Sequence, residues 1–372
     1  MSEESVDIGI PKERKPREGR VALVPEAVAE LVRAGHAVRV ETGAGEASGY
    51  GDEAYRQAGA EVVADTGDLY AASRLIVKVK EPIPEEYGYY RSDHVLFSFL
   101  HLAAVPELAD FLCERGVAAF AFETLETKDG NLPLLAPMSA IAGRVAAQYA
   151  NTLLHAPNGG RGLMLGGSPG TDRGSVVVMG AGEVGSHAAH LLSSVGARVD
   201  VFDLDLDRAD HLATYGPGQI TGLYPYRDLV GERVARADAI VGAVLTAGAR
   251  APTVVTRDMV AAMSAGSVIA DVAVDQGGCV ETTRPTDYTE PTYVAEGVIH
   301  FAVTNMPAAV PRSASKSLSA RLLPYVEKLA RMPLNAPKEA LAQEPEMNAA
   351  LNVYGGRIDH PAVAASLGKQ PA

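Results

Sequence analysis

Short apolar runs alternate with amphipathic stretches along most of this chain, and this alternation sets its expected fold. The apolar runs are rich in β-branched residues, which is typical of buried strands. The amphipathic stretches begin near proline and end at glycine, as at Pro25 and Gly35, which is typical of helices. We expect strands at residues 6–10, 36–42, 60–63, 75–82, 94–102 and 117–124, and helices at 25–34, 52–58 and 105–115. Strands and helices in alternation predict an α/β fold with a parallel sheet.

The same pattern resumes after a long, proline-bounded helix expected at 133–155. Strands are expected at 176–179, 198–202, 239–245 and 266–275, and helices at 186–195, 226–235, 256–263 and 312–331. The residues after 331 contain several prolines and predict surface packing. A chain of 372 residues exceeds one ordinary core. We therefore expect two doubly wound parallel-sheet domains bridged by the long helix, with a glycine-rich stretch at 157–171 as a candidate hinge or lid.

The most specific pattern lies between Ser175 and Asp203. An apolar strand leads into Gly180-Ala-Gly182-Glu-Val-Gly185, which is a G-x-G-x-x-G turn. A helix, a second strand and an acid follow, and the acid lies about 20 residues past the glycines. This order predicts a dinucleotide-binding βαβ unit of the Rossmann type.

Each residue of that pattern has a separate physical role. Gly180 permits the tight turn, Gly182 lets the backbone approach a pyrophosphate, and Gly185 lets the helix pack closely on the strand. Asp203 can accept hydrogen bonds from both ribose hydroxyls and would repel a 2′-phosphate, which favours NAD over NADP. The alternative is a glycine-rich turn that binds no ligand; the strand, helix and acid in register argue against it.

Composition narrows the class of protein. The formal charge is −13 and no long basic run occurs, which argues against general binding to nucleic acid or anionic membranes. Two cysteines, Cys113 and Cys279, cannot form a disulfide framework or a cysteine-based zinc site, and they fit a reducing compartment. The acidic N-terminus lacks a secretory signal, and no apolar stretch is long enough to cross a bilayer. We expect a cytoplasmic protein with no metal.

Polar side chains stand where several of the predicted strands end. Arg20 precedes an apolar run and has the geometry to bind a small carboxylate through two hydrogen bonds. Lys78 and Lys80 should share one face of a strand, and His101 ends the next. Ligands of open α/β sheets bind at the carboxyl ends of the strands, so Lys80 and His101 together indicate a catalytic site.

Two acids follow the last predicted strand of the nucleotide-binding region. Asp271 and Asp275 are both near its end, where either could cap or solvate the strand. Asp275 directly precedes a Gln-Gly-Gly turn, so it is the better candidate for a side chain that faces a nicotinamide.

With these residues in view, the chain resembles the alanine dehydrogenases over nearly its whole length. The most specific segments include Val77-Lys-Val-Lys-Glu-Pro, Phe99-Leu-His-Leu-Ala-Ala, Gly159-Gly-Arg-Gly-Leu-Met, Asp275-Gln-Gly-Gly-Cys and Asn305-Met-Pro. Nicotinamide nucleotide transhydrogenases share the fold and some of these segments. The chain departs from the alanine dehydrogenase pattern at Ala140, at Pro225 and across residues 312–320.

The resemblance implies NAD-dependent, reversible oxidative deamination of L-alanine to pyruvate and ammonia, in a homohexamer. It implies a discontinuous substrate domain, residues 1–139 and 306–372, around an NAD-binding domain, residues 140–305. By the same resemblance, Arg20 and Lys80 would bind substrate, and His101 and Asp275 would handle protons. The implied cofactor contacts, beyond Gly180, Gly182 and Gly185, are Ser139, Asp203, Arg208, Val244, Leu245, Asn305 and Met306.

This chemistry is consistent with the residue types. Hydride can leave the substrate Cα only when the neighbouring nitrogen is neutral, so a base that titrates near neutral pH is needed, which suits histidine. Three other possibilities stay open: a related dehydrogenase with another small 2-oxo acid, a nucleotide-binding relative without turnover, and a soluble transhydrogenase subunit.

Overall fold

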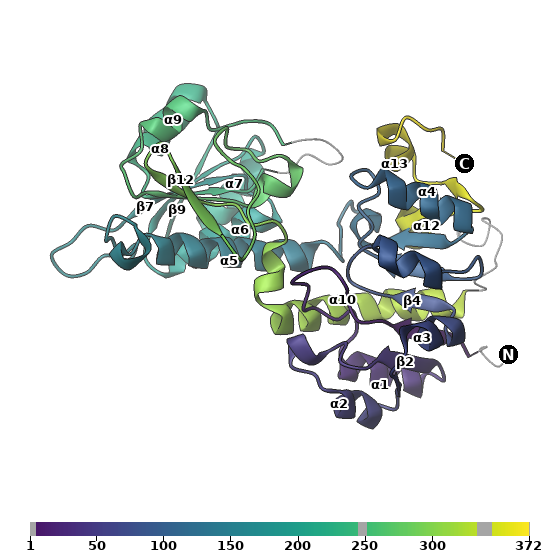
Figure 1. Cartoon of the computed structure of the whole chain (residues 1–372). Coiled ribbons are helices and arrows are strands. Elements are labelled where there is room, and N and C mark those ends of the chain that lie inside the picture. The colour runs from purple at the N-terminus through teal and green to yellow at the C-terminus, as the bar shows by residue number, and fades with distance from the viewer. Residues whose placement is uncertain (1–4, 245–250, 333–343, 372) are drawn as a thin grey trace. The chain divides into compact units, whose positions relative to one another are not determined.

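The computed structural model describes residues 5–244, 251–332 and 344–371. The chain divides into two compact units (Figure 1). Unit 1 consists of Met1–Met138 and Val310–Ala372, and unit 2 consists of Ser139–Ala309. Each unit is built on its own mostly parallel sheet, so the predicted α/β class is confirmed.

The sheet of unit 1 has eight strands in the order β15-β14-β6-β5-β4-β1-β2-β3. The strands from β6 to β3 are parallel. Their bounds are β1 Asp7–Ile10, β2 Ala37–Glu41, β3 Glu61–Val63, β4 Leu75–Val77, β5 Val95–Ser98 and β6 Ala118–Ala121. The central strands β1, β4, β5 and β6 are nearly all apolar and almost fully buried, as in a parallel sheet covered on both faces, whereas the edge strand β3 is partly exposed.

Helices from both ends of the chain complete unit 1. They are α1 Pro25–Arg33, α2 Asp52–Gln57, α3 Thr66–Ala72, α4 Pro106–Arg115, α10 Pro311–Arg331, α12 Pro345–Ala350 and α13 Pro361–Ser366. In Figure 1 the yellow α13 lies beside the blue α4, although some 250 residues separate them. The short 3-10 helices are η1 Glu46–Ser48, η2 Pro84–Tyr89 and η3 Phe122–Thr124.

The expectation that the residues after 331 form only surface packing is wrong. Strand β14, Leu351–Tyr354, pairs antiparallel with β6, and β15, Arg357–Ile358, forms a hairpin with it. Leu351, Asn352 and Val353 are completely buried. The C-terminal segment therefore supplies one edge of the sheet and part of the core of unit 1.

The long helix α10 is fixed to the first part of the chain by serine hydroxyls. The backbone N–H of Val21 donates to Ser315 Oγ at 2.9 Å, and that of Val24 donates to Ser319 Oγ at 3.1 Å. Both serines are fully buried. They satisfy the backbone of the loop that leads into α1, a segment that has no strand partner.

Unit 2 has a sheet of seven strands in the order β12-β13-β11-β10-β7-β8-β9, in which only β12 is antiparallel. The bounds are β7 Ser175–Met179, β8 Arg198–Phe202, β9 Gln219–Leu223, β10 Ala239–Gly242, β11 Val268–Asp271, β12 Thr292–Ala295 and β13 Val298–Phe301. The helices are α5 Ala136–Leu153, α6 Glu183–Ser194, α7 Leu206–Tyr215, α8 Arg227–Arg236 and α9 Arg257–Ala261, with η4 Ala156–Asn158, η5 Val272–Gln276 and η6 Met306–Ala309. The sequence did not predict β9, β12, β13 or α7.

The glycine-rich stretch at 157–171 lies inside unit 2 rather than at a boundary between the units. Two of its glycines are in close backbone contact. A Cβ on Gly160 would be 2.1 Å from the carbonyl oxygen of Leu153, and one on Gly166 would be 2.3 Å from that of Val195. Close packing accounts for these two glycines.

Several strands end earlier than predicted, and this difference shapes the candidate site. β4 ends at Val77, β5 at Ser98, β6 at Ala121 and β11 at Asp271. The polar residues expected on strand ends therefore lie on the loops and 3-10 turns that follow.

Among the residues that the structure describes, none of the helices has the length and apolar character of a membrane span.

Candidate active site

Four adjacent parallel strands of unit 1, in the order β6-β5-β4-β1, bring their carboxyl ends to one edge of the sheet. The segments that follow them carry Arg20 after β1, Lys80 after β4, His101 after β5 and Glu123 after β6. This is the edge at which open α/β sheets bind ligands. Sequence reasoning found the first three of these residues and missed the fourth.

Arg20 is almost completely buried and is held by a neighbour. Its Nε and Nη2 donate to the two carboxylate oxygens of Glu18 at 2.7 and 2.5 Å. Its Nη1 lies 3.3 Å from the thioether sulfur of Met138, which is a weak acceptor. The bidentate side of the guanidinium that was expected to take a ligand carboxylate thus contacts Glu18, and Nη1 faces the sulfur of Met138.

The two lysines after β4 have different environments. The strand ends at Val77, so both lysines lie after it. Lys78 is 1% exposed, and its Nζ forms an ion pair with Glu86 at 2.5 Å. The side chain of Lys80 is 15% exposed, and its Nζ lies 3.7 Å from Glu81 Oε2. Lys78 is therefore a structural charge, whereas Lys80 is the lysine available to a ligand.

A buried carboxylate supports the segment that carries Lys80. Glu13 accepts hydrogen bonds from the backbone N–H groups of Val79 and Lys80, at 2.5 and 3.3 Å. Burial raises the pKa of Glu13 to about 7, although the nearby Lys78 ammonium lowers it. Nothing in the sequence pattern singles out this carboxylate, which is one of several charged residues in the loop after β1.

His101 has a left-handed backbone, with φ of 48°. This conformation is costly for a residue with a side chain and is found preferentially at functional sites. The imidazole is 40% exposed and stacks on Phe99, with ring centroids 5.8 Å apart. His101 therefore presents an accessible ring on a loop whose backbone is held in a strained shape.

Glu123 is the residue that holds this loop. Its carboxylate accepts the backbone N–H of His101 at 2.6 Å and that of Leu100 at 3.2 Å. The same Oε1 lies 4.0 Å from His101 Nδ1. The sequence feature that could have identified Glu123 is an acidic residue just after β6, because β6 is the neighbour of the strand that leads to His101.

In unit 2, the three glycines of the turn have different surroundings. Gly180 has φ of 103°, and a Cβ there would be 2.6 Å from the carbonyl oxygen of Ala243. A Cβ on Gly185 would be 1.8 Å from the carbonyl oxygen of Gly180. A Cβ on Gly182, by contrast, would meet no heavy atom within 4 Å among the described residues. Gly180 and Gly185 are needed for packing, and Gly182 leaves open the space where a phosphate group would approach.

Asp203 lies against the glycine turn. Its Oδ2 accepts the N–H of Ala181 at 2.5 Å, and its Oδ1 accepts the N–H of Asp205 at 2.8 Å. Each carboxylate oxygen can accept a further hydrogen bond. Arg208, in the first turn of α7, forms an exposed ion pair with Asp205 at 3.2 Å.

Asp271 and Asp275 differ in their burial. Asp271 is fully buried and accepts hydrogen bonds from the backbone of Ala273, Cys279 and Val280, among other donors. It therefore fixes the turn after β11 and is a structural residue. Asp275 is exposed on η5.

The other predicted cofactor contacts lie on separate segments of unit 2. Ser139 is in the first turn of α5, and the N–H of Val244 contacts the Cys279 sulfur. Asn305 has φ of 60° and leads into η6, and Met306 is buried, with its carbonyl oxygen accepting the hydroxyl of Tyr288 at 2.7 Å. Leu245 lies outside the described residues.

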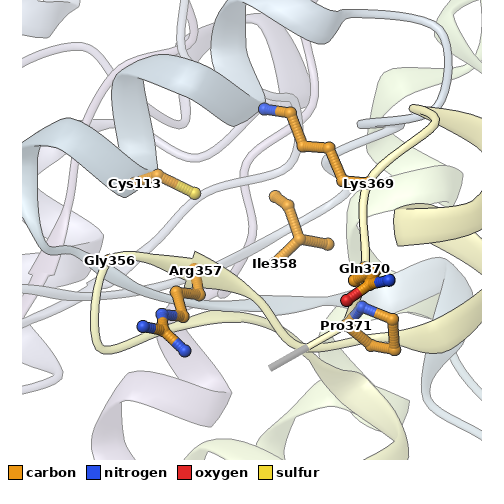
Figure 2. A pocket seen from close by; sticks show the side chains of 7 residues that line it. All are labelled: Cys113, Gly356, Arg357, Ile358, Lys369, Gln370 and Pro371. Carbon is orange, nitrogen blue, oxygen red and sulfur yellow. The ribbon is translucent and has the colours of Figure 1, made fainter.

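A pocket of about 360 Å³ lies elsewhere on unit 1 (Figure 2). It is formed by the β14–β15 hairpin, the C-terminal tail and α4, and its lining includes Cys113, Arg357 and Lys369. None of the predicted site residues lines it. Among the described residues, no group of histidine, cysteine, aspartate and glutamate side chains could hold a metal ion.

Comparison with known proteins identifies the family. The profile "Alanine dehydrogenase/PNT, N-terminal domain" matches residues 9–142, and "Alanine dehydrogenase/PNT, C-terminal domain" matches residues 146–361. This chain belongs to the alanine dehydrogenase/PNT family. The resemblance inferred from the sequence is thereby confirmed.

Individual members of the alanine dehydrogenase/PNT family are similar over almost the full chain. An alanine dehydrogenase of Bacillus subtilis is 47% identical, covering 97% of this chain and 94% of its own, and one of Mycobacterium tuberculosis is 42% identical, covering 97% and 96%. A solved L-alanine dehydrogenase has a TM-score of 0.93 at 46% identity, covering 97% and 99%. A transhydrogenase from Sinorhizobium meliloti has a TM-score of 0.81 at 28% identity, covering 96% and 99%.

Proposed function

We propose that this protein is an NAD-dependent alanine dehydrogenase, which converts L-alanine, NAD⁺ and water to pyruvate, ammonium, NADH and a proton, reversibly. The observation that carries the proposal is the similarity to alanine dehydrogenases, at up to 47% identity over 97% of the chain. Arg20, Lys80, His101 and Asp275 are all present within that similarity. A relative that had lost turnover would be expected to lack some of these groups.

In this proposal one unit binds the substrate and the other binds NAD. Residues 1–139 and 306–372 bind the substrate, and residues 140–305 bind NAD. The open space at Gly182 and the acid at Asp203 support a dinucleotide on the glycine turn. Asp203 favours NAD over NADP, because its carboxylate would repel a 2′-phosphate. Ser139, Arg208, Val244, Leu245, Asn305 and Met306 complete the proposed cofactor contacts.

Arg20 and Lys80 bind and orient the substrate. Nη1 of Arg20 would exchange its contact with Met138 for one to the substrate carboxylate, which is a stronger acceptor. Lys80 binds the carboxylate or polarises the carbonyl oxygen of pyruvate. Fixing the substrate between two cations aims its Cα–H bond, and such positioning supplies a large share of the rate.

His101 and Asp275 handle the protons. His101 removes a proton from the substrate ammonium, because hydride leaves Cα only when the nitrogen is neutral. It releases that proton to solvent and, as a neutral imidazole again, takes a proton from the water that adds to the iminium carbon. Asp275 holds the nitrogen as it leaves or attacks. NAD, when bound, supplies the hydride acceptor.

The decisive assay follows NADH oxidation with pyruvate and ammonium. We expect turnover with the wild type, and a loss of about 10²- to 10⁴-fold in kcat for His101→Ala, with the protein still folded. A panel of other 2-oxo acids separates alanine from another small amino acid as the substrate. Tight NADH binding without turnover on any member of the panel would overturn the enzymatic proposal.

We also propose a cytoplasmic homohexamer. The assembly follows from the family resemblance, and the location is supported by Cys113 and Cys279, which are both free thiols. Light scattering coupled to size-exclusion chromatography measures the assembly directly: a mass near six times 38.9 kDa supports the hexamer.

A further inference from the structure

The side chain of Glu13 accepts backbone hydrogen bonds from the segment that carries Lys80, where a neighbouring strand would normally accept them. β4 pairs with β1 through Leu75 and Ile76 and then ends. On the other side of the segment, the N–H of Phe99 still donates to the carbonyl oxygen of Val79 at 3.1 Å. Toward β1, the N–H groups of residues 79 and 80 instead donate to Glu13. A carboxylate thus extends the backbone ladder, and unlike a peptide carbonyl it can take up a proton.

Glu13 lies among other ionisable groups that come from its own loop and from three neighbouring segments. These are Glu18 of its own loop, Lys78 after β4, Glu86 of η2, Tyr90 directly after η2, and Tyr70 of α3. The one cation among them, Lys78, is already paired with Glu86. Both tyrosines are buried and have raised pKa values, so they stay neutral. Burial outweighs the attraction of Lys78, and the pKa of Glu13 rises to about 7.

We propose that Glu13 is a positioning residue, whose ionised carboxylate fixes the backbone at Lys80 and thereby makes binding of the 2-oxo acid depend on the protonation of Glu13. The inference rests on the proposed function, in which Lys80 binds that substrate. An ionised carboxylate accepts both N–H groups. A protonated one keeps an O–H in place of one acceptor, so one of the two buried N–H groups loses a good partner. The Lys80 segment then shifts, and substrate binding weakens as the pH falls below about 7.

Glu13→Gln tests this directly, because glutamine has the shape of the protonated acid at every pH. We expect KM for pyruvate to be about tenfold higher than in the wild type at pH 8, with kcat changed less than threefold, since one charged hydrogen bond is lost. At pH 6 the two KM values should converge, because the wild type is then protonated as well. The ratio of the two KM values cancels every pH dependence that the two proteins share. A ratio that is constant between pH 6 and pH 8 overturns the proposal, because a purely structural role would give that result.

Glu41→Gln is the matched control. Glu41, the last residue of β2, is also a buried carboxylate; it accepts the N–H of Lys12 at 2.8 Å and pairs with Arg14, so it holds the same loop from β2. We expect its KM ratio to the wild type to be independent of pH. A pH-dependent ratio for Glu41→Gln as well would assign the effect to the loop in general and overturn the role of Glu13.

A second readout needs no catalysis. Amide hydrogen exchange of a peptide spanning residues 77–82, corrected for the intrinsic pH dependence, should show more protection at pH 8 than at pH 6 in the wild type and no such change in Glu13→Gln. If pyruvate is not turned over but exchange behaves in this way, the proposed function fails while the coupling of Glu13 to Lys80 stands. If turnover is normal but protection of this peptide does not respond to pH, the coupling fails alone.

Discussion

The candidate sites in the two units are built in opposite ways. In unit 2 the glycine turn and Asp203 come from one continuous stretch, and the turn owes its shape to backbone packing and to glycines that leave no room for a side chain. In unit 1 the site residues come from four segments that are far apart in the sequence. Carboxylates hold three of these segments: Glu18 pairs with Arg20, and Glu13 and Glu123 accept backbone N–H groups at Lys80 and His101. A phosphate-binding turn can be encoded by one short sequence motif. A site for a small charged substrate needs charged side chains from several segments, and other charged side chains hold these in position.

Removing Glu18 should have the largest effect on stability. Glu18→Ala leaves the buried guanidinium of Arg20 without its bidentate partner, so we expect the free energy of unfolding to fall by about 3–5 kcal/mol. Denaturant titration measures it. The matched control is Asp205→Ala, which removes an exposed partner of Arg208 in unit 2 and should cost about 0–1 kcal/mol from that pair. Equal losses in the two variants would contradict the view that the buried pair of Glu18 and Arg20 holds the site of unit 1.

Glu13 should make the stability of the protein depend on pH. Its folded pKa of about 7 lies above the ordinary value of 4.5, so the folded state binds more protons than the unfolded state between these values. Its contribution to stability is therefore fully present below pH 4.5 and is lost as the pH rises through about 7. As the pH rises from 4.5 to about 7, the free energy of unfolding of Glu13→Gln should increase relative to that of the wild type by up to about 3 kcal/mol. Urea unfolding at a series of pH values checks this, and a constant difference between the two proteins would exclude it.

The glycine turn should separate packing from ligand binding. Gly185→Ala places a methyl group against the backbone of Gly180, and we expect a loss of stability of about 1–3 kcal/mol or more. Gly182→Ala enters open space, so it should leave the melting temperature nearly unchanged and weaken NADH binding. Thermal unfolding and fluorescence titration with NADH measure the two effects. Similar behaviour of both variants would contradict the division of roles.

Asp203→Asn should give the smallest change. The amide keeps the shape but loses the charge that would repel a 2′-phosphate, so the preference for NADH over NADPH should fall by about tenfold, or about 1.4 kcal/mol. The ratio of kcat/KM for the two cofactors measures it. An unchanged preference would show that other residues of unit 2 select the cofactor.

Local patterns predicted most of the fold, and non-local pairing accounts for the failures. Apolar runs such as Val176–Met179 identified the central strands, because strands buried on both faces need continuous hydrophobicity. β14 was missed because its partner, β6, lies some 230 residues earlier and its run of four residues contains a buried asparagine. β9 was missed because it is an edge strand and only partly buried.

The candidate site was predictable only as far as its strand-end residues. Arg20, Lys80 and His101 stand out because their types and positions suit chemistry at the end of a parallel sheet. Glu13, Glu18 and Glu123 do not stand out, because their importance depends on loop conformations that bring each carboxylate to a particular donor. The period of two along the strand does not reveal that Lys78 is buried against Glu86 while Lys80 is partly exposed, because Glu86 comes from a separate segment, η2.

The backbone of His101 has a consequence for anyone who tries to make this protein more heat-resistant. A left-handed conformation costs a residue with a side chain on the order of 1 kcal/mol relative to glycine, and Glu123 holds the chain in that shape. Replacing His101 with glycine would relieve the strain and, by the proposed mechanism, abolish turnover. A screen that selects for thermal tolerance alone would therefore favour inactive sequences at this position, so engineering of the enzyme has to select for activity at the same time.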